Sequence, residues 1–337
     1  MSDVLKFGIV GTGRIGRMHV SNINKLIDGA EIIAAADLYI DAAADELKAN
    51  GVKHLYKDYK ELLANPDVEA VIVASSTDTH AEISIAAAQA GKNVFCEKPI
   101  DKDLDKIKEV LNVVKETGVK FQTGFNRRFD HNFRRVRDLV TDGTLGDPHI
   151  VRVTSRDPAP PPIEYVKVSG GIFFDMMIHD FDMVRYLSGS EVVEVSAIGA
   201  VLVDEEIGAA GDVDTAIVTL KFANGAIGVI DNSRQAVYGY DQRVEVFGSK
   251  GMAKAENDKP TTVEVNTVDP PTTDKIPYFF LDRYTNAFID QFKEFIISIN
   301  EDKPTMVTAE DGYCAVQIAY AATESCRSGK PVKVSLD

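Results

Sequence analysis

The sequence predicts an α/β protein with two domains: a doubly wound, parallel sheet at residues 1–123 and an α+β domain at residues 124–337. Two observations predict this organisation. Up to residue 123, short apolar runs alternate strictly with helical segments, which is typical of a parallel sheet with helices on both faces. Beyond residue 124, several segments instead alternate apolar and polar side chains in the manner of antiparallel strands.

Composition and charge narrow the class of protein. With 337 residues, 45% of them hydrophobic, the chain can bury two cores. The formal net charge is −15 and no basic stripe offsets it, so we expect no nucleic-acid partner. No apolar run approaches the roughly 20 residues of a transmembrane helix, and Met1 leads almost directly into a strand, without room for a signal peptide. We therefore expect no membrane association.

The cysteines and histidines favour a cytoplasmic protein without a bound metal. Cys96, Cys314 and Cys326 are odd in number and far apart, which favours reduced thiols. We interpret Cys96 as a buried strand residue rather than a nucleophile. The six histidines show no Cys/His spacing typical of zinc.

The first predicted strand, residues 5–10, runs directly into Gly11, Gly13 and Gly16, which have the spacing G-x-G-x-x-G. A helical pattern follows, so the motif has the strand and helix context of a dinucleotide site. Gly11 allows the tight turn, Gly13 lets the backbone approach a pyrophosphate, and Gly16 lets helix and strand pack closely. Arg14 opposes the helix dipole unless it meets a bound diphosphate; a solvated arginine is the alternative.

The second predicted strand, residues 31–36, ends at Asp37, about twenty residues after the third glycine. A carboxylate at this place would accept hydrogen bonds from the adenosine ribose. The next three residues include no Arg or Lys to receive a 2′-phosphate, which favours NAD over NADP. The residues that we assign to the cofactor in these two segments are Gly11, Thr12, Gly13, Arg14, Ile15, Gly16, Asp37 and Leu38.

The alternation continues to residue 123. Helices are predicted at residues 41–50, 58–64, 81–90 and 104–117, and strands at residues 68–74, 93–96 and 119–123. Ser75 and Thr77 follow a strand, where small hydroxyl side chains contact a cofactor or cap a helix equally well. We assign both to the cofactor and assign His80 to capping.

The strand at residues 93–96 ends in Glu97, Lys98 and Pro99. Ligands of an open parallel sheet bind beyond the carboxyl ends of its strands, so Glu97 and Lys98 would project into that crevice. Pro99 lacks an amide hydrogen and has a fixed φ, and it therefore ends the strand. A solvated Glu-Lys pair is the alternative, but the dinucleotide motif upstream favours a functional role.

The second half has fewer motifs. Helices are predicted up to residue 141 and at residues 284–299 and 309–327, a proline-rich loop at residues 156–162, and strands at residues 149–155, 192–203, 215–222, 226–233 and 243–247.

A helix predicted at residues 172–187 carries two stripes. Its apolar face consists of Phe174, Met177, Ile178, Phe181 and Val184. The polar stripe beside it consists of Asp175, His179, Asp182 and Tyr186. Asp175 and His179 are i,i+4 neighbours. Such pairs are common on protein surfaces, but this one flanks a buried stripe and follows Ser169-Gly170-Gly171, which favours a helix with one edge in a cleft.

With these motifs, the chain resembles the glucose–fructose oxidoreductase and inositol dehydrogenase family over its whole length. The segments AGKNVFCEKP (90–99) and GGIFFDMMIHDFD (170–182) carry the resemblance. The segments GFNRRFD (124–130), SRDP (155–158) and YGYD (238–241) are most similar to bacterial inositol 2-dehydrogenases of the family. The resemblance implies an NAD(P)-binding Rossmann domain, a C-terminal domain with a large open, mostly antiparallel sheet, and a homo-oligomer, dimer or tetramer, built through that sheet.

The resemblance also implies residue roles. Lys98, Asp175 and His179 would serve the chemistry, with Glu97 and Lys98 beside the cofactor. The residues implied to bind substrate are Lys98, Asn126, Arg127, Asp157, Asp175, His179 and Tyr238. The expected reaction is NAD-dependent oxidation of a secondary hydroxyl of a cyclic polyol, myo-inositol giving 2-keto-inositol.

In this expected mechanism His179 takes the hydroxyl proton, Asp175 orients the imidazole, and Lys98 stabilises developing negative charge. Three alternatives stay open: oxidation of another inositol isomer or an aldose, redox-neutral glycoside cleavage with NAD, and non-catalytic sugar sensing. The intact Lys98, Asp175 and His179 count against the last.

Overall fold

The computed structural model describes residues 4–335 and divides into two compact units. The first unit comprises the chain up to Phe129 together with Asn286–Cys314, and the second comprises Asp130–Thr285 and the chain from Ala315 onward. The sequence instead predicts a single boundary after residue 123, which would assign residues 286–314 to the second domain.

The first unit is built on a six-stranded sheet in the order β3-β2-β1-β4-β5-β6. Its strands are β1 (Leu5–Val10), β2 (Ala30–Ala36), β3 (His54–Tyr56), β4 (Ala70–Val73), β5 (Asn93–Cys96) and β6 (Phe121–Thr123). Every pairing among them is parallel. The predicted doubly wound parallel sheet is therefore confirmed, and its order reverses between β1 and β4, where open α/β sheets bind their ligands.

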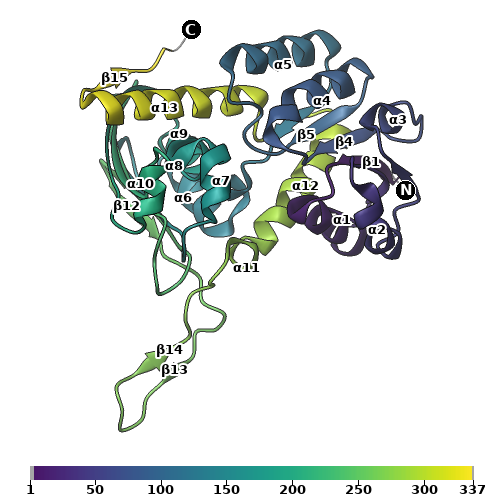
Figure 1. The fold of residues 1–337 in the computed structure, drawn as a ribbon. Helices are drawn as coiled ribbons and strands as arrows, with labels where there is room; N and C mark the ends of the chain where they lie inside the picture. Colours follow the sequence, from purple (N-terminus) through teal and green to yellow (C-terminus); the bar gives the residue numbers. More distant parts are fainter. Residues whose placement is uncertain (1–3, 336–337) are drawn as a thin grey trace. The chain divides into compact units, whose positions relative to one another are not determined.

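Helices cover both faces of this sheet. They are α1 (Arg14–Leu26), η1 (Ile40–Ala42), α2 (Ala44–Ala49), α3 (Tyr59–Leu63), α4 (Thr77–Gln89), α5 (Leu104–Thr117), η2 (Asn126–Phe129) and α12 (Thr285–Asn300). The helices α4 and α5 lie on the face opposite α1 and α12 (Figure 1). Phe292 and Phe295 of α12 join Phe7, Ile23 and Phe95 in one buried cluster, so the core of the first unit includes a helix from late in the chain.

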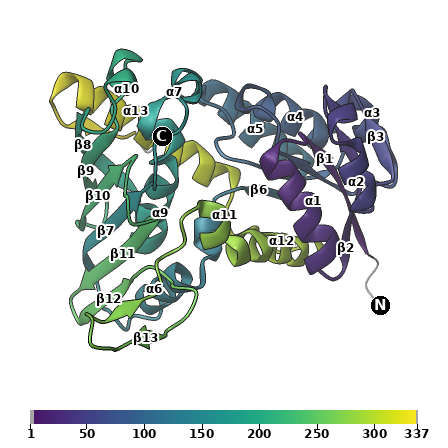
Figure 2. The ribbon, with the colours of Figure 1, turned by 60° about the horizontal axis from the view of Figure 1, so that its bottom comes forward.

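The second unit is built on a seven-stranded sheet in the order β12-β11-β7-β10-β9-β8-β15. The strands from β12 to β8 follow one another in this order in Figure 2. Its strands are β7 (Pro148–Arg156), β8 (Val192–Ala200), β9 (Thr215–Phe222), β10 (Ile227–Ser233), β11 (Asp241–Gly248), β12 (Gly251–Ala255) and β15 (Val332–Lys333). Among the described strands of this sheet, β7 and β10 run parallel and the other pairs run antiparallel. The expectation of a mostly antiparallel sheet is confirmed.

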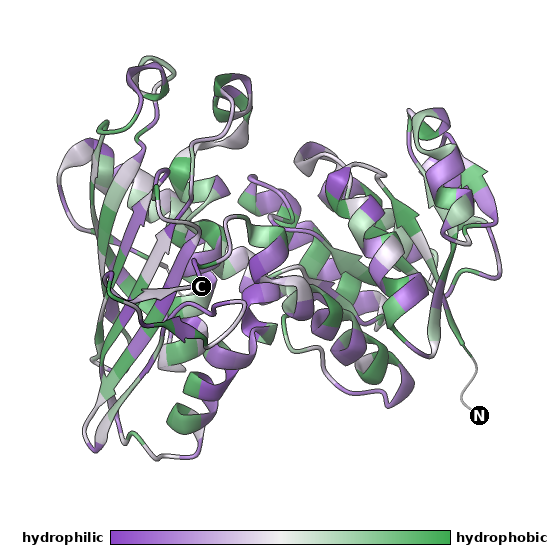
Figure 3. Ribbon diagram, turned by 90° about the horizontal axis from the view of Figure 1, so that it is seen from below, coloured by the Kyte–Doolittle hydropathy of each residue, from purple (hydrophilic) through white to green (hydrophobic). Residues whose placement is uncertain are grey.

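One face of this sheet is covered and the other is open. The helices of the unit are α6 (His131–Thr141), α7 (Ile163–Ser169), α8 (Gly171–Asp175), α9 (Ile178–Ser188), α10 (Glu205–Ala209) and α11 (Phe280–Arg283), and α13 (Ala309–Ser328) belongs to it from Ala315 onward. α9 packs against β7. Along β9 buried and exposed residues alternate. Hydrophobic and hydrophilic residues are mixed along the strands of the sheet (Figure 3). A small hairpin, β13 (Glu264–Val265) and β14 (Thr272–Thr273), extends away from the sheet (Figure 1).

The structure differs from the predicted elements at several places. α7, α10 and β12 were not predicted, and the helix predicted at residues 172–187 is wrong as a single element, since it divides into α8 and α9. Within residues 4–335, no helix is both long and apolar enough to cross a membrane.

Candidate functional site

The glycine loop leaves space in front of helix α1. Gly11 has φ +97°, and a Cβ there would lie 2.4 Å from the Ala74 carbonyl carbon. A Cβ on Gly16 would lie 2.0 Å from the Gly11 oxygen, whereas one on Gly13 would meet nothing within 4 Å. No side chain caps the start of α1. The open backbone at Gly13, with the first amides of a 13-residue helix behind it, fits a pyrophosphate.

Asp37 lies just beyond the end of β2 and holds the glycine loop. Its Oδ2 accepts hydrogen bonds from the Thr12 amide at 2.7 Å and the Thr12 hydroxyl at 3.0 Å, and its Oδ1 accepts from the Tyr39 amide at 2.8 Å. The neighbouring Leu38 is 78% exposed, and Arg14 at the start of α1 is also exposed. This arrangement suits a dinucleotide such as NAD, because a carboxylate that can accept ribose hydroxyls follows β2 and no Arg or Lys directly follows it.

The segment after β4 differs from its prediction in one respect. Ser75 and Thr77 are both half-buried at the start of α4, and the Ser75 hydroxyl contacts that of Thr79 at 2.7 Å. His80 does not cap the helix. Its ring nitrogens lie 2.8 Å from the Pro99 carbonyl oxygen and 3.0 Å from that of Ser75, so His80 joins the chain beyond β4 to the chain beyond β5.

Glu97 is not a solvated partner of Lys98. Its carboxylate Oε1 lies 2.7 Å from Nε2 of His19 on α1, and its side chain is 14% exposed. Gly124 makes room for it, because a Cβ there would lie 2.8 Å from Glu97 Oε2. The motif is therefore fixed to the helix that follows the glycine loop, and the half-buried Lys98 stands on a firmly held strand end.

Cys96 is fully buried in β5. Burial raises the pKa of its thiol to about 12, and a thiol that is not ionised is a poor nucleophile. The interpretation of Cys96 as a structural residue is confirmed.

Asn126 and Arg127 lie buried in the short helix η2. The neighbouring Arg128 pairs with Asp311 at 2.8 Å. Within the described part of the chain, Nδ2 of Asn126 is buried without a hydrogen-bond partner. A buried amide donor without a partner is unusual, and it fits a group that meets a ligand.

Asp175 and His179 fall on either side of a break in the helix. Asp175 is the last residue of α8, whereas His179 is the second residue of α9. Both are half-buried, and the residues between them are fully buried. The predicted apolar face is confirmed as buried, but Asp182 of the polar stripe is also fully buried rather than at a cleft edge.

The carboxylate of Asp175 has two partners that the sequence does not predict. Its Oδ1 accepts a hydrogen bond from the Tyr165 hydroxyl at 2.8 Å, and its Oδ2 lies 3.3 Å from Nη1 of Arg234. Burial, and then the Asp175 charge, raise the pKa of Tyr165 well above its usual range. Tyr165 lies on the unpredicted helix α7 and Arg234 follows β10, so neither stands near Asp175 in the sequence.

The two other residues assigned to substrate lie in the same unit. Asp157 is half-buried at the end of β7, where its amide donates to the Ser233 carbonyl oxygen at 2.9 Å. The Tyr238 hydroxyl donates to Asp241 at 2.6 Å and accepts from Arg156 at 3.3 Å, and its ring is about half exposed.

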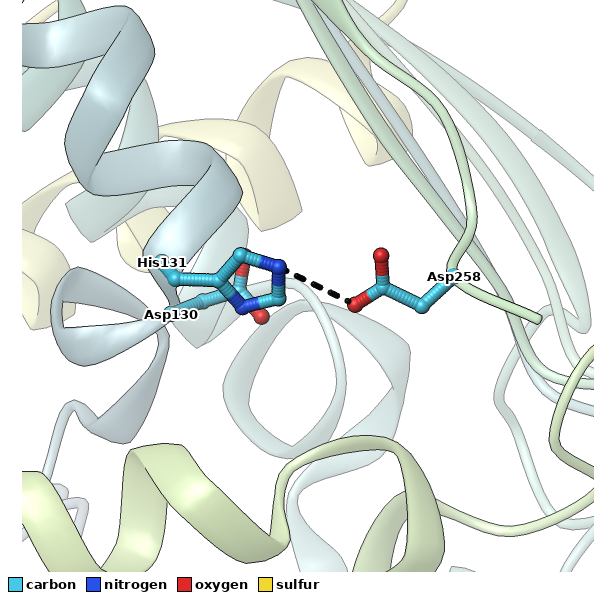
Figure 4. A group of neighbouring side chains, drawn as sticks. All are labelled: Asp130, His131 and Asp258. Atoms are coloured by element: carbon cyan, nitrogen blue, oxygen red, sulfur yellow. Dashed lines mark ion pairs between the residues drawn. The ribbon is translucent and has the colours of Figure 1, made fainter. Parts of the chain in front are cut away.

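Among residues 4–335, one group of side chains has metal-ligand character: Asp130, His131 and Asp258 (Figure 4). Both carboxylate oxygens of Asp130 already have protein partners. Oδ1 accepts hydrogen bonds from the amides of Asn132 and Phe133, and Oδ2 lies 2.5 Å from Nη1 of the buried Arg283. The Arg283 guanidinium also lies 3.6 Å from Asp258. Since an arginine already offsets these charges, we assign no metal to the group.

Comparison with known proteins identifies the class. The model of the oxidoreductase family with an NAD-binding Rossmann fold, GFO/IDH/MocA, matches residues 5–125. The model of the GFO/IDH/MocA C-terminal domain matches residues 133–254. The chain therefore belongs to this family of NAD-dependent oxidoreductases.

Its relatives are similar over nearly the full chain. The chain is 50% identical to the myo-inositol 2-dehydrogenase of Thermotoga maritima over 330 residues, 98% of each chain. It is 43% identical to the inositol 2-dehydrogenase of Rhizobium meliloti, over 98% of this chain and 99% of that one. A solved structure of scyllo-inositol dehydrogenase from Lactobacillus casei with bound NAD(H) and scyllo-inositol has a TM-score of 0.92 and 32% identity, covering 98% and 99% of the two chains.

Proposed function

We propose that this protein is an inositol 2-dehydrogenase that oxidises myo-inositol to 2-keto-inositol with NAD. The observation that carries the proposal is the similarity, at 43–50% identity over nearly whole chains, to relatives named for this reaction. The intact Lys98, Asp175 and His179 support an enzyme over a sensor.

The first unit would bind the cofactor. Gly11, Gly13 and Gly16 would accept the pyrophosphate against α1, and Asp37 would hold the adenosine ribose. Arg14 would meet the diphosphate, and Thr12, Ile15, Leu38, Ser75, Thr77 and Glu97 would complete the site. When bound, the nicotinamide supplies a hydride acceptor.

The remaining residues would act on the substrate. His179 would take the proton of the reacting hydroxyl on a ring nitrogen, because an ordinary imidazole has a pKa of about 6.5 and is mostly deprotonated at neutral pH. Asp175 would orient that imidazole, and the Lys98 ammonium would donate to the reacting oxygen as negative charge develops. Asn126, Arg127, Asp157 and Tyr238 would bind the other hydroxyls.

The test is NADH formation by the purified protein with a panel of inositol isomers and aldoses. We expect myo-inositol to give the highest kcat/KM, and His179→Ala to abolish most of it. His54→Ala is the matched control, since His54 is an exposed histidine on β3. Substrate turnover without net NADH would instead indicate the redox-neutral alternative.

Oxidation of another inositol isomer is the second candidate. The similarity to a scyllo-inositol dehydrogenase over nearly the whole chain supports it. The same panel separates the two, because scyllo-inositol differs from myo-inositol only in the configuration at one carbon. A higher kcat/KM for scyllo-inositol would replace the first proposal.

We further propose a cytoplasmic homo-oligomer, a dimer or tetramer, that packs through the open face of the seven-stranded sheet. Large apolar side chains are exposed on its strands β8 to β12: Ile198, Ile217, Ile227, Phe247 and Met252. Ile198 pairs with Ile217 and Phe247 with Met252, so they gather into patches, which commonly mark interfaces. Light scattering should show Ile217→Lys dissociating the oligomer, whereas Leu26→Lys, at an exposed leucine of α1, should not.

A further inference from the structure

Arg234 is a buried cation between two carboxylates. Its side chain is 1% exposed. Nη1 donates a hydrogen bond to Asp175 Oδ2 at 3.3 Å, whereas Nη2 lies 3.5 Å from Asp212 Oδ2 and forms an ion pair without a hydrogen bond. Its backbone amide donates to the Asp214 carbonyl oxygen at 2.8 Å, directly after β10. This backbone hydrogen bond at the ends of β9 and β10 therefore fixes the position of the Arg234 backbone.

The two carboxylates lie at the two ends of helix α8. Asp212 Oδ1 accepts the amide hydrogen of Ile172 at 3.0 Å, at the start of the helix. Gly171 has φ +83°, and a Cβ there would lie 2.7 Å from Asp212 Oδ1. Asp175 is the last residue of the helix. A single guanidinium thus holds the beginning and the end of this five-residue helix.

Both carboxylates need a positively charged partner, because they are largely buried. The Asp212 and Asp175 side chains are 12% and 15% exposed, and a nearly buried carboxylate is costly without a partner. The planar guanidinium of arginine presents donors in two directions, whereas the ammonium group of lysine is a compact point charge. The arginine at residue 234 therefore hydrogen-bonds Asp175 and lies within ion-pair distance of Asp212 at the same time.

We propose that Arg234 is a positioning residue of the reaction. By holding Asp212 and Asp175, it fixes the direction of the Asp175 carboxylate and the turn that leads into α9, and through them the place of His179. Arg234 acts through Asp175 rather than on the substrate. The predicted effect on kcat rests on the proposed function, whereas the predicted effect on the position of Asp175 does not.

The kinetic test uses Arg234→Met, Arg234→Lys, Asp175→Asn and the double variant Arg234→Met/Asp175→Asn. We expect Arg234→Met to lower kcat by about 10²-fold, as a misplaced catalytic group does, with KM for NAD unchanged. Arg234→Lys should recover part of the loss. In the Asp175→Asn background Arg234→Met should add little, because groups that act as a unit are not additive.

The control is Arg283→Met. Arg283 is an equally buried arginine of the same unit that pairs with Asp130 and Asp258, so its loss should lower the melting temperature without lowering the kcat of the folded protein. A folded Arg234→Met with wild-type kcat, or a full additional loss in the Asp175→Asn background, would overturn the proposal. If Arg234→Met does not fold, the kcat of Arg234→Lys, alone and in the Asp175→Asn background, is compared in the same way.

A crystal structure provides the readout that is independent of activity. If the wild type oxidises no polyol, the proposed function fails, and the position of the Asp175 carboxylate in Arg234→Met still decides the inference. A displaced or rotated carboxylate supports it. A carboxylate that keeps its place and its Tyr165 hydrogen bond overturns it.

Discussion

Nε2 of His19 lies 2.7 Å from Oε1 of Glu97 and connects helix α1 to the Glu97-Lys98-Pro99 motif. The His19 ring is fully buried and meets the rings of Phe95, Phe288 and Phe292 edge-on. The segment that follows the glycine loop and the strand end that carries Lys98 are therefore tied together inside the first unit.

We predict that His19→Phe, which keeps an aromatic ring but removes this contact, weakens both NAD affinity and stability. A hydrogen bond to a charged group contributes roughly 1.5–3 kcal/mol. His19→Gln, which restores a donor, should recover part of the loss. Cofactor titration and thermal melts provide the measurement, with Phe288→Leu as a control that disturbs the ring cluster alone. Wild-type NAD affinity in folded His19→Phe would contradict the prediction.

Cofactor preference should depend on Asp37. Its carboxylate would repel a 2′-phosphate, so we expect a higher kcat/KM with NAD than with NADP, and Asp37→Ser should reduce that ratio. The control is Asp41→Ser, because Asp41 is an exposed neighbour that pairs with Lys57. Equal kcat/KM with NAD and NADP in the wild type would contradict the assignment of Asp37 as the residue that selects NAD.

Lys98→Ala should lower kcat by about 10²–10³-fold, the usual cost of losing one preorganised donor to developing charge. Lys98→Arg should rescue only part, because a planar fork does not replace a compact ammonium group. Lys115→Ala, at an exposed lysine of α5, serves as the control. If Lys98→Ala stays within a few-fold of wild type while it folds and binds NAD, Lys98 is an ordinary strand-end residue.

The pH dependence should report the base. Because His179 must be deprotonated to accept a proton, log kcat/KM should rise with pH and level off above the imidazole pKa. His179→Ala should lose this rise and most turnover, yet still bind NAD, since the predicted cofactor residues lie in the other unit. Near-normal turnover of His179→Ala across the pH range would exclude it as the base.

Acid stability should depend on Asp214. Burial alone would raise the pKa of its carboxyl, but hydrogen bonds from three backbone amides and the Thr215 hydroxyl outweigh burial and hold the pKa below its ordinary value. Its contribution is therefore complete above the unfolded pKa of about 3.9 and is lost as the pH falls through the folded pKa. Denaturant unfolding should show Asp214→Asn less stable at neutral pH and less sensitive to acid, whereas the exposed Asp138→Asn should change neither.

The sequence predicted the elements that local periodicity determines. The strand before Gly11 and the strand before Glu97 were correct, because a buried parallel strand and its turn residues lie within one short segment. The partners of Asp175 were not predictable in this way. Tyr165 and Arg234 come from segments 10 and 59 residues away, and no local pattern specifies such contacts.

The break between α8 and α9 was not predictable from local spacing either. Helical spacing runs through Met176 and Met177, so the pattern predicts one helix, whereas α8 ends at Asp175, whose carboxylate contacts Arg234 from another part of the chain. The same holds for His80, whose ring reaches a carbonyl 19 residues away. Both positions make a polar contact with a distant part of the chain, and no local pattern specifies such a contact.

The place of α12 in the first unit has a consequence for how the protein is made. Phe292 and Phe295 complete a core whose other members, such as Phe7 and Phe95, leave the ribosome much earlier. Domains generally fold as units during synthesis. The part of this core formed by the N-terminal segment therefore stays exposed to solvent until α12 has been synthesised. Chaperones that shield exposed apolar surface would act during this interval, and a gene fragment that ends at residue 129 should yield an aggregating product.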